Sequence, residues 1–390
     1  MKNLSVIIPG YNCQETLREA VKSVYRQNLE SFEIVLVDDA STDDTWTLMN
    51  QLASEHQEIK IFRHQKNQGG GATRNTAVKE STNDVIFCLD SDDILGDGTL
   101  AKMLKMLEEK KCDGVGISTS IKFKKRDTKN IAFVNNFGFV GEKIPFESLL
   151  EKNGKALCPL YSTFMFTKRA FTTTGGYPTT HGFDTQGFAW RFLANGLIAY
   201  TCPNATYFHR IAFGRSYYIR EYESGKLSHN WFKIYEEFLF LFNDQTKKEI
   251  LDYDLNNKAL TLSESISKQD NVFTSDYQGL LVPEIKKIYA DRVRSKQAQS
   301  PFDEYWLGAE EYNKNNYQEA TKWLTRSLEK GLTSAEVYFK LYDSLAKLNN
   351  TSYQDVSKLI SARYQYKQQG RLAPFHRRLV RKIIRTLKKR

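Results

Sequence analysis

Short apolar runs alternate with helix-like patterns over the first 110 residues of the chain. The apolar runs are Leu4–Ile8, Phe32–Val37, Ile59–Phe62 and the stretch from Asp84 to Leu89. Between them, apolar residues recur at helical spacing, as in Leu17, Ala20, Val21 and Val24. This β-α-β-α-β order predicts the α/β class, with an open, mostly parallel sheet and helices on both of its faces.

The remainder of the chain changes character twice. Residues 115–220 are less regular and rich in aromatics, with one clear helix expected from Thr185 to Asn195, and from about 228 the pattern is all-α. We therefore expect a catalytic domain at 1–220, a helical extension at 221–300, a helical module at 301–366 and a tail helix at 371–390.

Residues 301–332 are similar to one tetratricopeptide helix pair. The matching residues are Leu307, Gly308, Tyr317, Ala320, Leu324 and Leu328. A second unit, from Ala335 to about Lys358, matches poorly. One or two units cannot stack into a solenoid, so the pattern predicts a small helical module, and its helices are where two copies of the chain could associate.

Composition and the cysteine content limit the class of protein and its cellular compartment. The chain has 390 residues, is 41% hydrophobic and 26% charged, and its five cysteines form no CxxC pair, which favours a globular protein of a reducing cytosol without a zinc site or disulfide framework. The N-terminal apolar run is too short for a signal peptide, and no stretch is long enough to span a bilayer.

Most of the net charge of +10 lies in the tail. Residues 371–390 hold nine Lys or Arg and no acid, which leaves +1 for the other 370 residues. The tail's apolar residues form one stripe, at Phe375, Leu379, Val380, Ile383, Ile384 and Leu387. Three interpretations stay open: attachment to the anionic inner face of the cell membrane, which we prefer, an ordinary docked helix, or binding of a polyanionic acceptor. Nucleic acid is a poorer fit, because aromatic interleaving and a recognition fold are missing.

An acidic cluster follows the fourth apolar run. Asp90, Asp92 and Asp93 stand within four residues at the end of an apolar strand, where three carboxylates would repel one another in a dry interior. Oxygen ligands of this kind suit Mg²⁺ or Mn²⁺, which can also contact the phosphates of a nucleotide. Capping of the next helix would explain one carboxylate but not three. Pro9, Asp38 and Asp39 also stand at strand ends, so we expect them to meet Asp90 in one crevice.

Four motifs in order resemble glycosyltransferase family 2. They are Ser5-Val6-Ile7-Ile8-Pro9-Gly10-Tyr11-Asn12, Val37-Asp38-Asp39-Ala40-Ser41-Thr42-Asp43, Asn67-Gln68-Gly69-Gly70-Gly71-Ala72-Thr73-Arg74-Asn75 and Asp90-Ser91-Asp92-Asp93. The resemblance covers about residues 1–215. It implies the GT-A fold, a UDP-sugar donor, Mg²⁺ or Mn²⁺, and inversion at the anomeric carbon.

The resemblance also implies parts for single residues on the donor side. Asp92 would be the direct metal ligand, with Asp90 as its partner toward ribose or water and Asp93 as a structural residue. Asp38 and Asp39 resemble the pair that reads the base, and Pro9 and Tyr11 would form the wall around base and ribose. Arg74 would reach the base or a phosphate. The remaining donor-side residues that the motifs imply are Asn67, Gly70 and Ser91.

On the acceptor side, an inverting transfer needs a general base. The family usually supplies it from an acidic pair before a late helix, and Asp184 matches the second acid of that pair. The first position is Phe183, which departs from the family. Asp184 could also cap the helix that follows. His209 is a candidate third metal ligand, whereas Arg215 is the alternative occupant of the same place and would contact phosphate.

These observations predict a cytosolic-side inverting glycosyltransferase. Its acceptor would be a hydroxyl of a cell-surface glycan, a lipid-linked polysaccharide or a teichoic acid. Two alternatives stay open: a protein O-glycosyltransferase whose helical module grips a polypeptide, and a non-catalytic scaffold with a dead transferase domain. The sequence leaves the transferred sugar and the linkage open.

Overall fold

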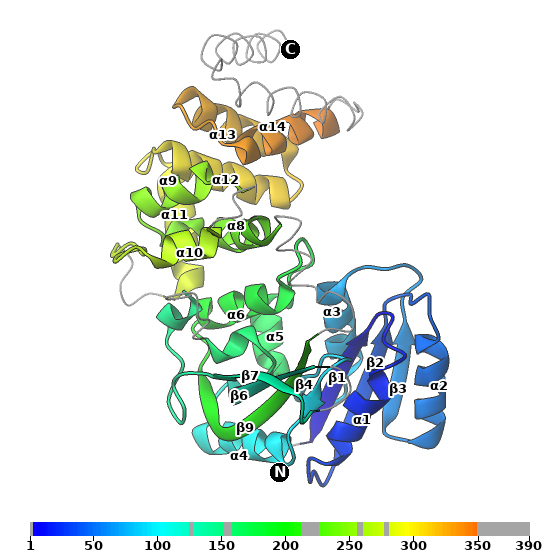
Figure 1. Ribbon diagram of the computed structural model, residues 1–390. Coiled ribbons are helices and arrows are strands. Elements are labelled where there is room, and N and C mark those ends of the chain that lie inside the picture. Colours follow the sequence, from blue (N-terminus) through cyan, green and yellow to red (C-terminus); the bar gives the residue numbers. More distant parts are fainter. Residues whose placement is uncertain are drawn as a thin grey trace. The chain divides into compact units, whose positions relative to one another are not determined.

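Four strands at the start of the chain form a parallel sheet. The computed structural model describes residues 3–124, 128–150, 158–211, 226–255, 260–276 and 281–348 (Figure 1). In it, β1 (Leu4–Gly10) lies between β2 (Phe32–Asp38) and β4 (Val85–Cys88), and β3 (Ile59–Arg63) lies beside β2. All three pairings are parallel, as expected from the apolar runs.

The sheet then continues through strands of both directions. Its order is β3-β2-β1-β4-β8-β6-β9-β5, and β7 also pairs with β6. The added strands are β5 (Ile94–Leu95), β6 (Gly114–Lys124), β7 (Ile131–Asn136), β8 (Phe164–Thr167) and β9 (Ala199–Ile211). β8 is antiparallel to β4 and β6, whereas β9 is parallel to β6. The sequence pattern over 115–220 did not reveal β6, β7, β8 and β9.

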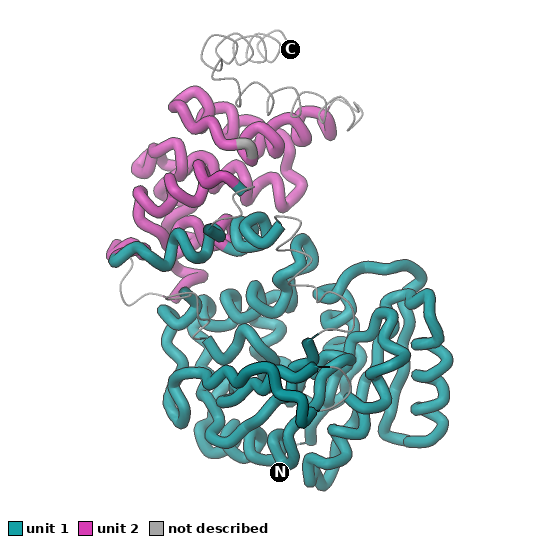
Figure 2. The backbone as a smooth tube through the Cα atoms, viewed as in Figure 1, with its two compact units in different colours: residues 1–234, 255–270 teal, residues 235–254, 271–390 magenta. Residues whose placement is uncertain are grey.

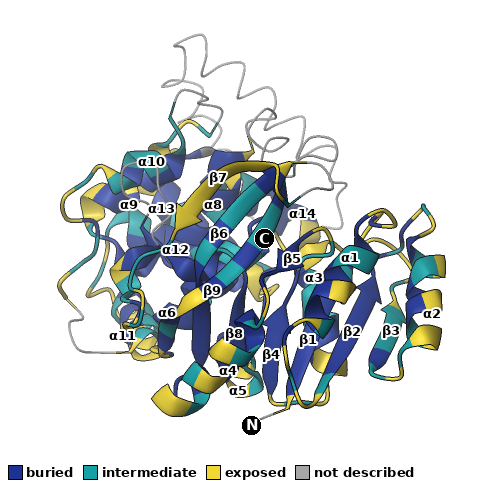
Figure 3. Ribbon diagram, turned by 60° about the horizontal axis from the view of Figure 1, so that its bottom comes forward, coloured by how far each residue is buried: buried dark blue, intermediate teal, exposed yellow. Residues whose placement is uncertain are grey.

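Helices cover both faces of the sheet. Leu4, Val6 and Ile8 of β1 belong to the main core with three helices, whereas the intervening Ile7 is buried on the other face. The helices of the main core are α1 (Leu17–Tyr25), α2 (Thr45–Glu55) and α4 (Thr99–Lys110), and α3 (Gly70–Glu80) contacts β1 and β2. Figure 3 shows β1 and β2 buried along their length, whereas β7 is exposed. The expected α/β class is confirmed.

A second group of helices supports the later strands. It consists of α5 (Lys168–Thr174), α6 (Asp184–Ala194) and the short 3₁₀ turns at Phe146–Leu149 and Pro159–Tyr161. Phe188 and Phe192 of α6 pack on Phe164 of β8, with ring centroids 5.5 Å and 5.4 Å apart. This aromatic cluster fixes α6 against the sheet, which matters because α6 begins with Asp184.

The chain divides into two compact units (Figure 2). The first consists of residues 1–234 and 255–270, and the second of 235–254 and 271–390. Among the residues described, the helices beyond β9 are α8 (Leu227–Glu237), α9 (Asp244–Asp252), α10 (Leu262–Ser267), α11 (Val282–Arg294), α12 (Pro301–Asn313), α13 (Tyr317–Glu329) and α14 (Ala335–Leu348), with a 3₁₀ turn at Leu239–Leu241. The expected all-helical C-terminal region is confirmed. The boundaries expected at 220, 300 and 366 stay predictions.

Gly308 allows the close packing of α12 on α13. A Cβ at that position would lie 2.8 Å from Cγ of Leu324. The likeness of this pair to a tetratricopeptide unit stays a prediction. The tail at 371–390 lies outside the described residues, and so does the end of the expected second unit, after Leu348. None of the helices described is both long and apolar enough to cross a membrane.

Candidate functional site

The ends of three parallel strands bring the predicted donor-side residues to one edge of the sheet. Asp38 is the last residue of β2, and the register pairs it with Gly10 at the end of β1. Asp39 N donates to the Gly10 carbonyl at 2.8 Å. Asp90 follows β4, which pairs with the other side of β1. The parallel direction of these strands is therefore what assembles the edge.

Asp38 and Asp39 both have protein partners. Asp38, fully buried, accepts from Ser41 N at 3.1 Å and forms an ion pair with Arg63 Nε at 2.8 Å. The Asp39 carboxylate accepts from the backbone amides of Gln68 and Gly69, at 2.9 Å and 2.8 Å. Asp39 thus holds the glycine loop to the end of β2.

His64 and Asn67 complete the contacts around Asp39. His64 Nδ1 lies 2.7 Å from Asp39 Oδ1, and its Nε2 lies 3.0 Å from Thr76 Oγ1. Asn67 Nδ2 donates to the Asp39 carbonyl at 3.4 Å. The Asp39 carboxylate thus has three partners, which are Gln68 N, Gly69 N and His64 Nδ1. A carboxylate has about four lone-pair positions, so Asp39 can accept one more hydrogen bond, as from a base.

The loop after β1 is fastened to the loop after β2. Asn12 N donates to Ser41 Oγ at 2.9 Å, and Thr42 N donates to Asn12 Oδ1 at the same distance. Asn12 has a φ of 50°, a left-handed conformation that asparagine tolerates well. Pro9 lies inside β1, whereas Tyr11 is 50% exposed at the loop. The predicted wall around base and ribose thus consists of Pro9 in the strand and the exposed ring of Tyr11.

Arg74 bridges the donor side to the predicted base. Its Nη2 lies 2.5 Å from Asp90 Oδ1, and its Nη1 lies 2.5 Å from Asp184 Oδ2. The guanidinium is 11% exposed and lies over the Tyr177 ring, 5.9 Å from the centroid. Two carboxylates separated by 94 residues of sequence therefore share one buried cation.

The glycine loop packs against the segment that carries Asp184. A Cβ on Gly71 would lie 1.9 Å from the Pro178 carbonyl oxygen, and one on Gly70 would lie 2.7 Å from Arg74 Nη1. Asn75 fastens the same segment, because its Nδ2 donates to the Tyr177 carbonyl at 2.9 Å. At Gly71, then, the missing side chain makes room for the protein's own backbone.

Asp184 is the first residue of α6, and Phe183 is its N-cap. Asp184 Oδ1 accepts from Thr185 N at 3.0 Å, while Oδ2 faces Arg74. Burial raises the pKa of the Asp184 carboxyl, and Arg74 opposes that effect only in part. Phe183 is buried against Trp231, with ring centroids 5.4 Å apart. The position where the family has a first acid is therefore part of the core here.

The three carboxylates of the acidic cluster have separate surroundings. Asp90 pairs with Arg74. Asp93 is buried and accepts from the Tyr207 hydroxyl, from His209 Nδ1 at 3.1 Å and from Arg210 N at 2.7 Å. The structural assignment of Asp93 fits these contacts.

Asp92 is exposed, and no ion pair to its carboxylate occurs among the residues that the structure describes. Its pKa is raised to about 7, because the surrounding protein disfavours the charged form and because Asp93 and Asp90 are close.

His209 is oriented by Asp93. The hydrogen bond at Nδ1 leaves Nε2 as the ring nitrogen that can meet a ligand. A carboxylate behind the far nitrogen is the usual arrangement of a metal-binding histidine. Burial lowers the pKa of His209, but the carboxylate of Asp93 outweighs it, and the pKa is raised.

The protein side chains alone do not form a complete metal site. Within the described ranges, no three His, Cys, Asp or Glu side chains converge in a way that could hold a metal ion. Asp92 and His209 nevertheless fit a cation that takes its other ligands from phosphate and water, as Mg²⁺ usually does. Arg215, the alternative partner of phosphate, lies outside the described residues.

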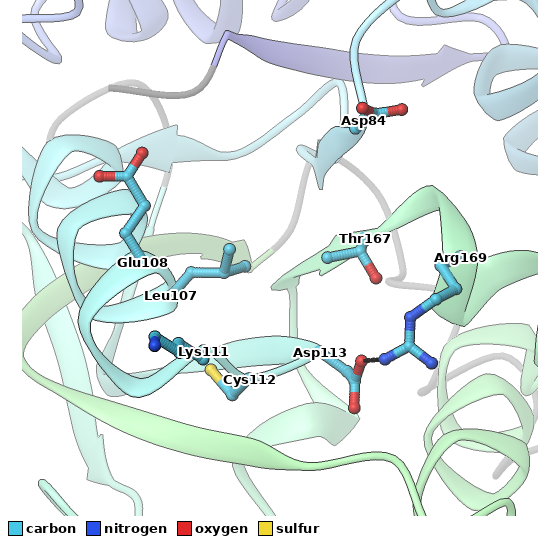
Figure 4. A pocket seen from close by; sticks show the side chains of 8 residues that line it. All are labelled: Asp84, Leu107, Glu108, Lys111, Cys112, Asp113, Thr167 and Arg169. Carbon is cyan, nitrogen blue, oxygen red and sulfur yellow. Dashed lines mark hydrogen bonds and ion pairs between the residues drawn. The ribbon is translucent and has the colours of Figure 1, made fainter.

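A separate cavity lies elsewhere in the part of the chain described. It has a volume of about 660 Å³ and lies where β4 and β6 begin, so it opens at the opposite edge of the sheet from Asp38 and Asp90. Figure 4 shows Asp113 of this cavity paired with Arg169. Its position separates it from the candidate site.

Comparison with known proteins identifies the N-terminal domain as a glycosyltransferase domain. Residues 5–174 match the family model described as "Glycosyl transferase family 2". This part of the chain is therefore similar to family 2 glycosyltransferases, in agreement with the four motifs. The match ends before Asp184, so it does not include the predicted base.

Several named relatives agree with that identification. "Putative glycosyltransferase EpsE" of Bacillus subtilis (strain 168) is 28% identical over 211 residues, which are 52% of this chain and 71% of that protein. "Poly(ribitol-phosphate) beta-glucosyltransferase" of Bacillus spizizenii is 33% identical over 113 residues, which are 28% of this chain and 18% of that protein. "Glycosyltransferase GlyG" of Streptococcus pneumoniae is 25% identical over 197 residues, which are 48% of this chain and 64% of that protein.

Among solved structures, S. aureus TarS 1-349 in complex with UDP-GlcNAc is 16% identical, with a TM-score of 0.49 and coverage of 95% of this chain and 92% of that chain. At this TM-score the similarity supports no conclusion about ligand or acceptor.

Proposed function

We propose that this chain transfers a sugar, with inversion, from a UDP-sugar to a hydroxyl of a cell-surface glycan, a lipid-linked polysaccharide or a teichoic acid. The observation that carries the proposal is the bridge of Arg74 between Asp90 and Asp184. It joins the edge that would bind the donor to the carboxylate that would act on the acceptor. The acceptor classes follow from the four motifs and from the names of relatives such as the Bacillus spizizenii enzyme.

Asp184 is the proposed general base. A base must be ionised near neutral pH yet hold a proton well enough to take it from a hydroxyl. Burial raises its pKa and Arg74 limits the rise, which is the balance that such a base needs. Each carboxylate oxygen has a further lone pair beyond its bond to Arg74 or Thr185, so Asp184 can still accept the acceptor's proton.

The donor would bind along the edge formed by β1, β2 and β4. Asp39, Pro9 and Tyr11 would contact the base and ribose, and the remaining proposed contacts come from Asp38, Asn67, Gly70, Arg74, Asp90, Ser91 and Arg215. A bound Mn²⁺ or Mg²⁺, held by Asp92 and His209 with Asp90 nearby, would neutralise the charge of the departing diphosphate. The 371–390 tail is proposed to attach the enzyme to an anionic membrane surface from the cytoplasmic side.

Two variants test the metal and the base separately. With Mn²⁺ and a panel of UDP-sugars, release of UDP should require the metal and should vanish in Asp92→Ala. Asp97→Ala is the matched control, because Asp97 is an exposed acid that pairs only with Arg26 among the residues described. Metal-independent turnover in Asp92→Ala would refute the metal assignment.

Asp184→Asn should bind UDP like the wild type and lose sugar transfer. The substitution keeps the shape of the side chain but removes its basicity, so the two readouts should separate. Sugar transfer at wild-type rates in Asp184→Asn would place the base on another residue.

A further inference from the structure

Three neighbouring strands align one row of side chains beside the acidic cluster. Ile94 of β5 pairs with Phe208 of β9, which sets the preceding Asp93 opposite His209. The register between β9 and β6 then pairs His209 with Lys122. Residues paired in register project from the same face of a sheet, so Asp93, His209 and Lys122 form a continuous row across β5, β9 and β6.

The row continues to an aromatic residue on β7. Lys122 pairs with Phe133, and the lysine Nζ lies 5.1 Å from the centroid of the phenyl ring. Figure 3 shows β9, β6 and β7 running side by side, with β7 exposed along its length. The ammonium of Lys122 is therefore placed between His209 on one side and an aromatic face on the other.

Lys122 lacks a counterion among the residues that the structure describes. Its side chain is half-buried. Asp93 already accepts three hydrogen bonds, from Tyr207, His209 and Arg210. A desolvated ammonium without an ion pair costs free energy, and a bound anion would offset that cost.

A second cation, on the opposite face of the same strands, is paired within the protein, unlike Lys122. Arg210, the neighbour of His209, is buried there over the Phe123 ring, 4.6 Å from the centroid. Its guanidinium is satisfied within the protein, because it contacts Glu19 at 2.5 Å and the Asp92 carbonyl at 2.7 Å. Of these two neighbouring cations, Lys122 is the one left available to a ligand.

We propose that Lys122 binds the diphosphate of the nucleotide-sugar donor. This inference rests on the proposed function, because it places the diphosphate beside His209 and the acidic cluster. A lysine is a compact point charge that suits phosphate oxygens, and it would also stabilise the charge that develops on the leaving diphosphate. Lys122 thus adds a donor-binding residue from a strand outside the four family motifs.

The test compares two ligands that differ only in their phosphates. UDP binding is measured by calorimetry and uridine binding by ligand-detected NMR, both with the full chain and Mn²⁺. Lys122→Met should weaken UDP binding by about 10- to 100-fold, the loss of one charge-assisted hydrogen bond, and leave uridine binding unchanged. Lys122→Arg, which keeps the charge, should retain most of the affinity for UDP.

Lys124→Met is the matched control. Lys124 lies two residues further along the same face of β6 and is exposed, so a general effect of surface charge would appear in both methionine variants. We expect Lys124→Met to bind UDP within about twofold of the wild type. The thermal midpoint of Lys122→Met should equal or exceed that of the wild type, since a desolvated charge is removed.

Each contrary result has its own meaning. UDP binding of Lys122→Met at wild-type strength would overturn the lysine assignment and leave the proposed function standing. Equal losses for UDP and uridine would also overturn it, because they would indicate a structural part for the side chain. A wild-type chain that binds neither ligand would refute the nucleotide donor itself, and the lysine proposal with it.

Discussion

Replacing Arg74 by methionine removes a buried cation that contacts both Asp90 and Asp184. The substitution keeps a side chain of similar length, so it deletes charge and hydrogen bonds more than volume. Among the residues that the structure describes, Asp184 is then left buried with the amide of Thr185 as its remaining hydrogen-bond donor. We expect Arg74→Met to lower the stability of the first unit markedly, and not merely to weaken ligand binding.

The size of the loss follows from the exposure of the two carboxylates. Unit charges about 4 Å apart attract by about 4 kcal/mol at an effective dielectric constant of about 20. The Asp184 side chain is 11% exposed and should feel most of that attraction, whereas Asp90 is 36% exposed and is screened by solvent. Removing one partner of a buried pair costs about 3–5 kcal/mol, so we expect a loss of about 3 kcal/mol in the free energy of unfolding.

Urea unfolding of the full chain, followed by tryptophan fluorescence, measures the loss. Arg74→Met/Asp184→Asn should recover about 2 kcal/mol of it, because the orphaned carboxylate is gone. Arg18→Met is the control: Arg18 pairs with Glu55 at the surface, where both side chains are about one-third exposed, and its loss should cost less than about 1 kcal/mol.

The pH dependence gives an independent check. Burial raises the pKa of Asp184, so the folded state binds its proton more tightly than the unfolded state does. The contribution of such a group to stability is lost as pH rises above the ordinary value of about 3.9. Without Arg74 the pKa rises further, so the cost of Arg74→Met should grow from pH 5 to pH 8. A loss below about 1 kcal/mol that does not change with pH would refute the bridge.

Two further predictions concern packing and acid stability. Gly71→Ala should lower the thermal midpoint by several degrees, because its Cβ would meet the Pro178 carbonyl at 1.9 Å, whereas Gly175→Ala, with open space and a φ of 74°, should cost about 1 kcal/mol; equal midpoints would contradict the close approach. Burial acts to raise the pKa of Glu33, but Lys60, a hydroxyl and a backbone amide lower it to about 2. Its contribution, at most about 3 kcal/mol, should be present above pH 4.5 and lost toward pH 2, and Glu33→Gln should flatten that part of a stability-against-pH curve.

The parallel half of the sheet could be predicted from the sequence because its strands are buried on both faces. Such strands appear as unbroken apolar runs, and β1 and β4 do so. β6 and β9 could not be predicted as strands from the sequence. β6 ends in alternating Lys and apolar residues, and β9 contains Pro203 and Asn204. Their pairing is set by contacts 85 or more residues apart in sequence, as between Ser118 and Ala205, and no local pattern reports such a contact.

The candidate site shows the same division. Asp38, Asp39 and Asp90 could be placed at one edge because each follows an apolar run, and parallel strands align their ends. The side chains and amides that pair with these acids could not be predicted from the sequence. Arg74 was expected to face the base or a phosphate, but its contact with Asp184 spans 110 residues of sequence. Lys122 carried no signal, since a lysine near a strand end usually indicates an exposed edge.

The acidic cluster illustrates how contacts assign different tasks to similar residues. Three carboxylates in four residues cannot all remain unpaired in a crowded site. Arg74 neutralises Asp90, and the Tyr207 hydroxyl and two further donors satisfy Asp93, which leaves Asp92 as the exposed member without an ion pair in the part of the chain described. The surrounding protein and the nearby carboxylates of Asp93 and Asp90 raise the pKa of Asp92 to about 7, so its charged form carries a cost in free energy. A divalent cation would remove the cost at Asp92, just as a diphosphate would at Lys122, so metal and donor should stabilise each other's binding.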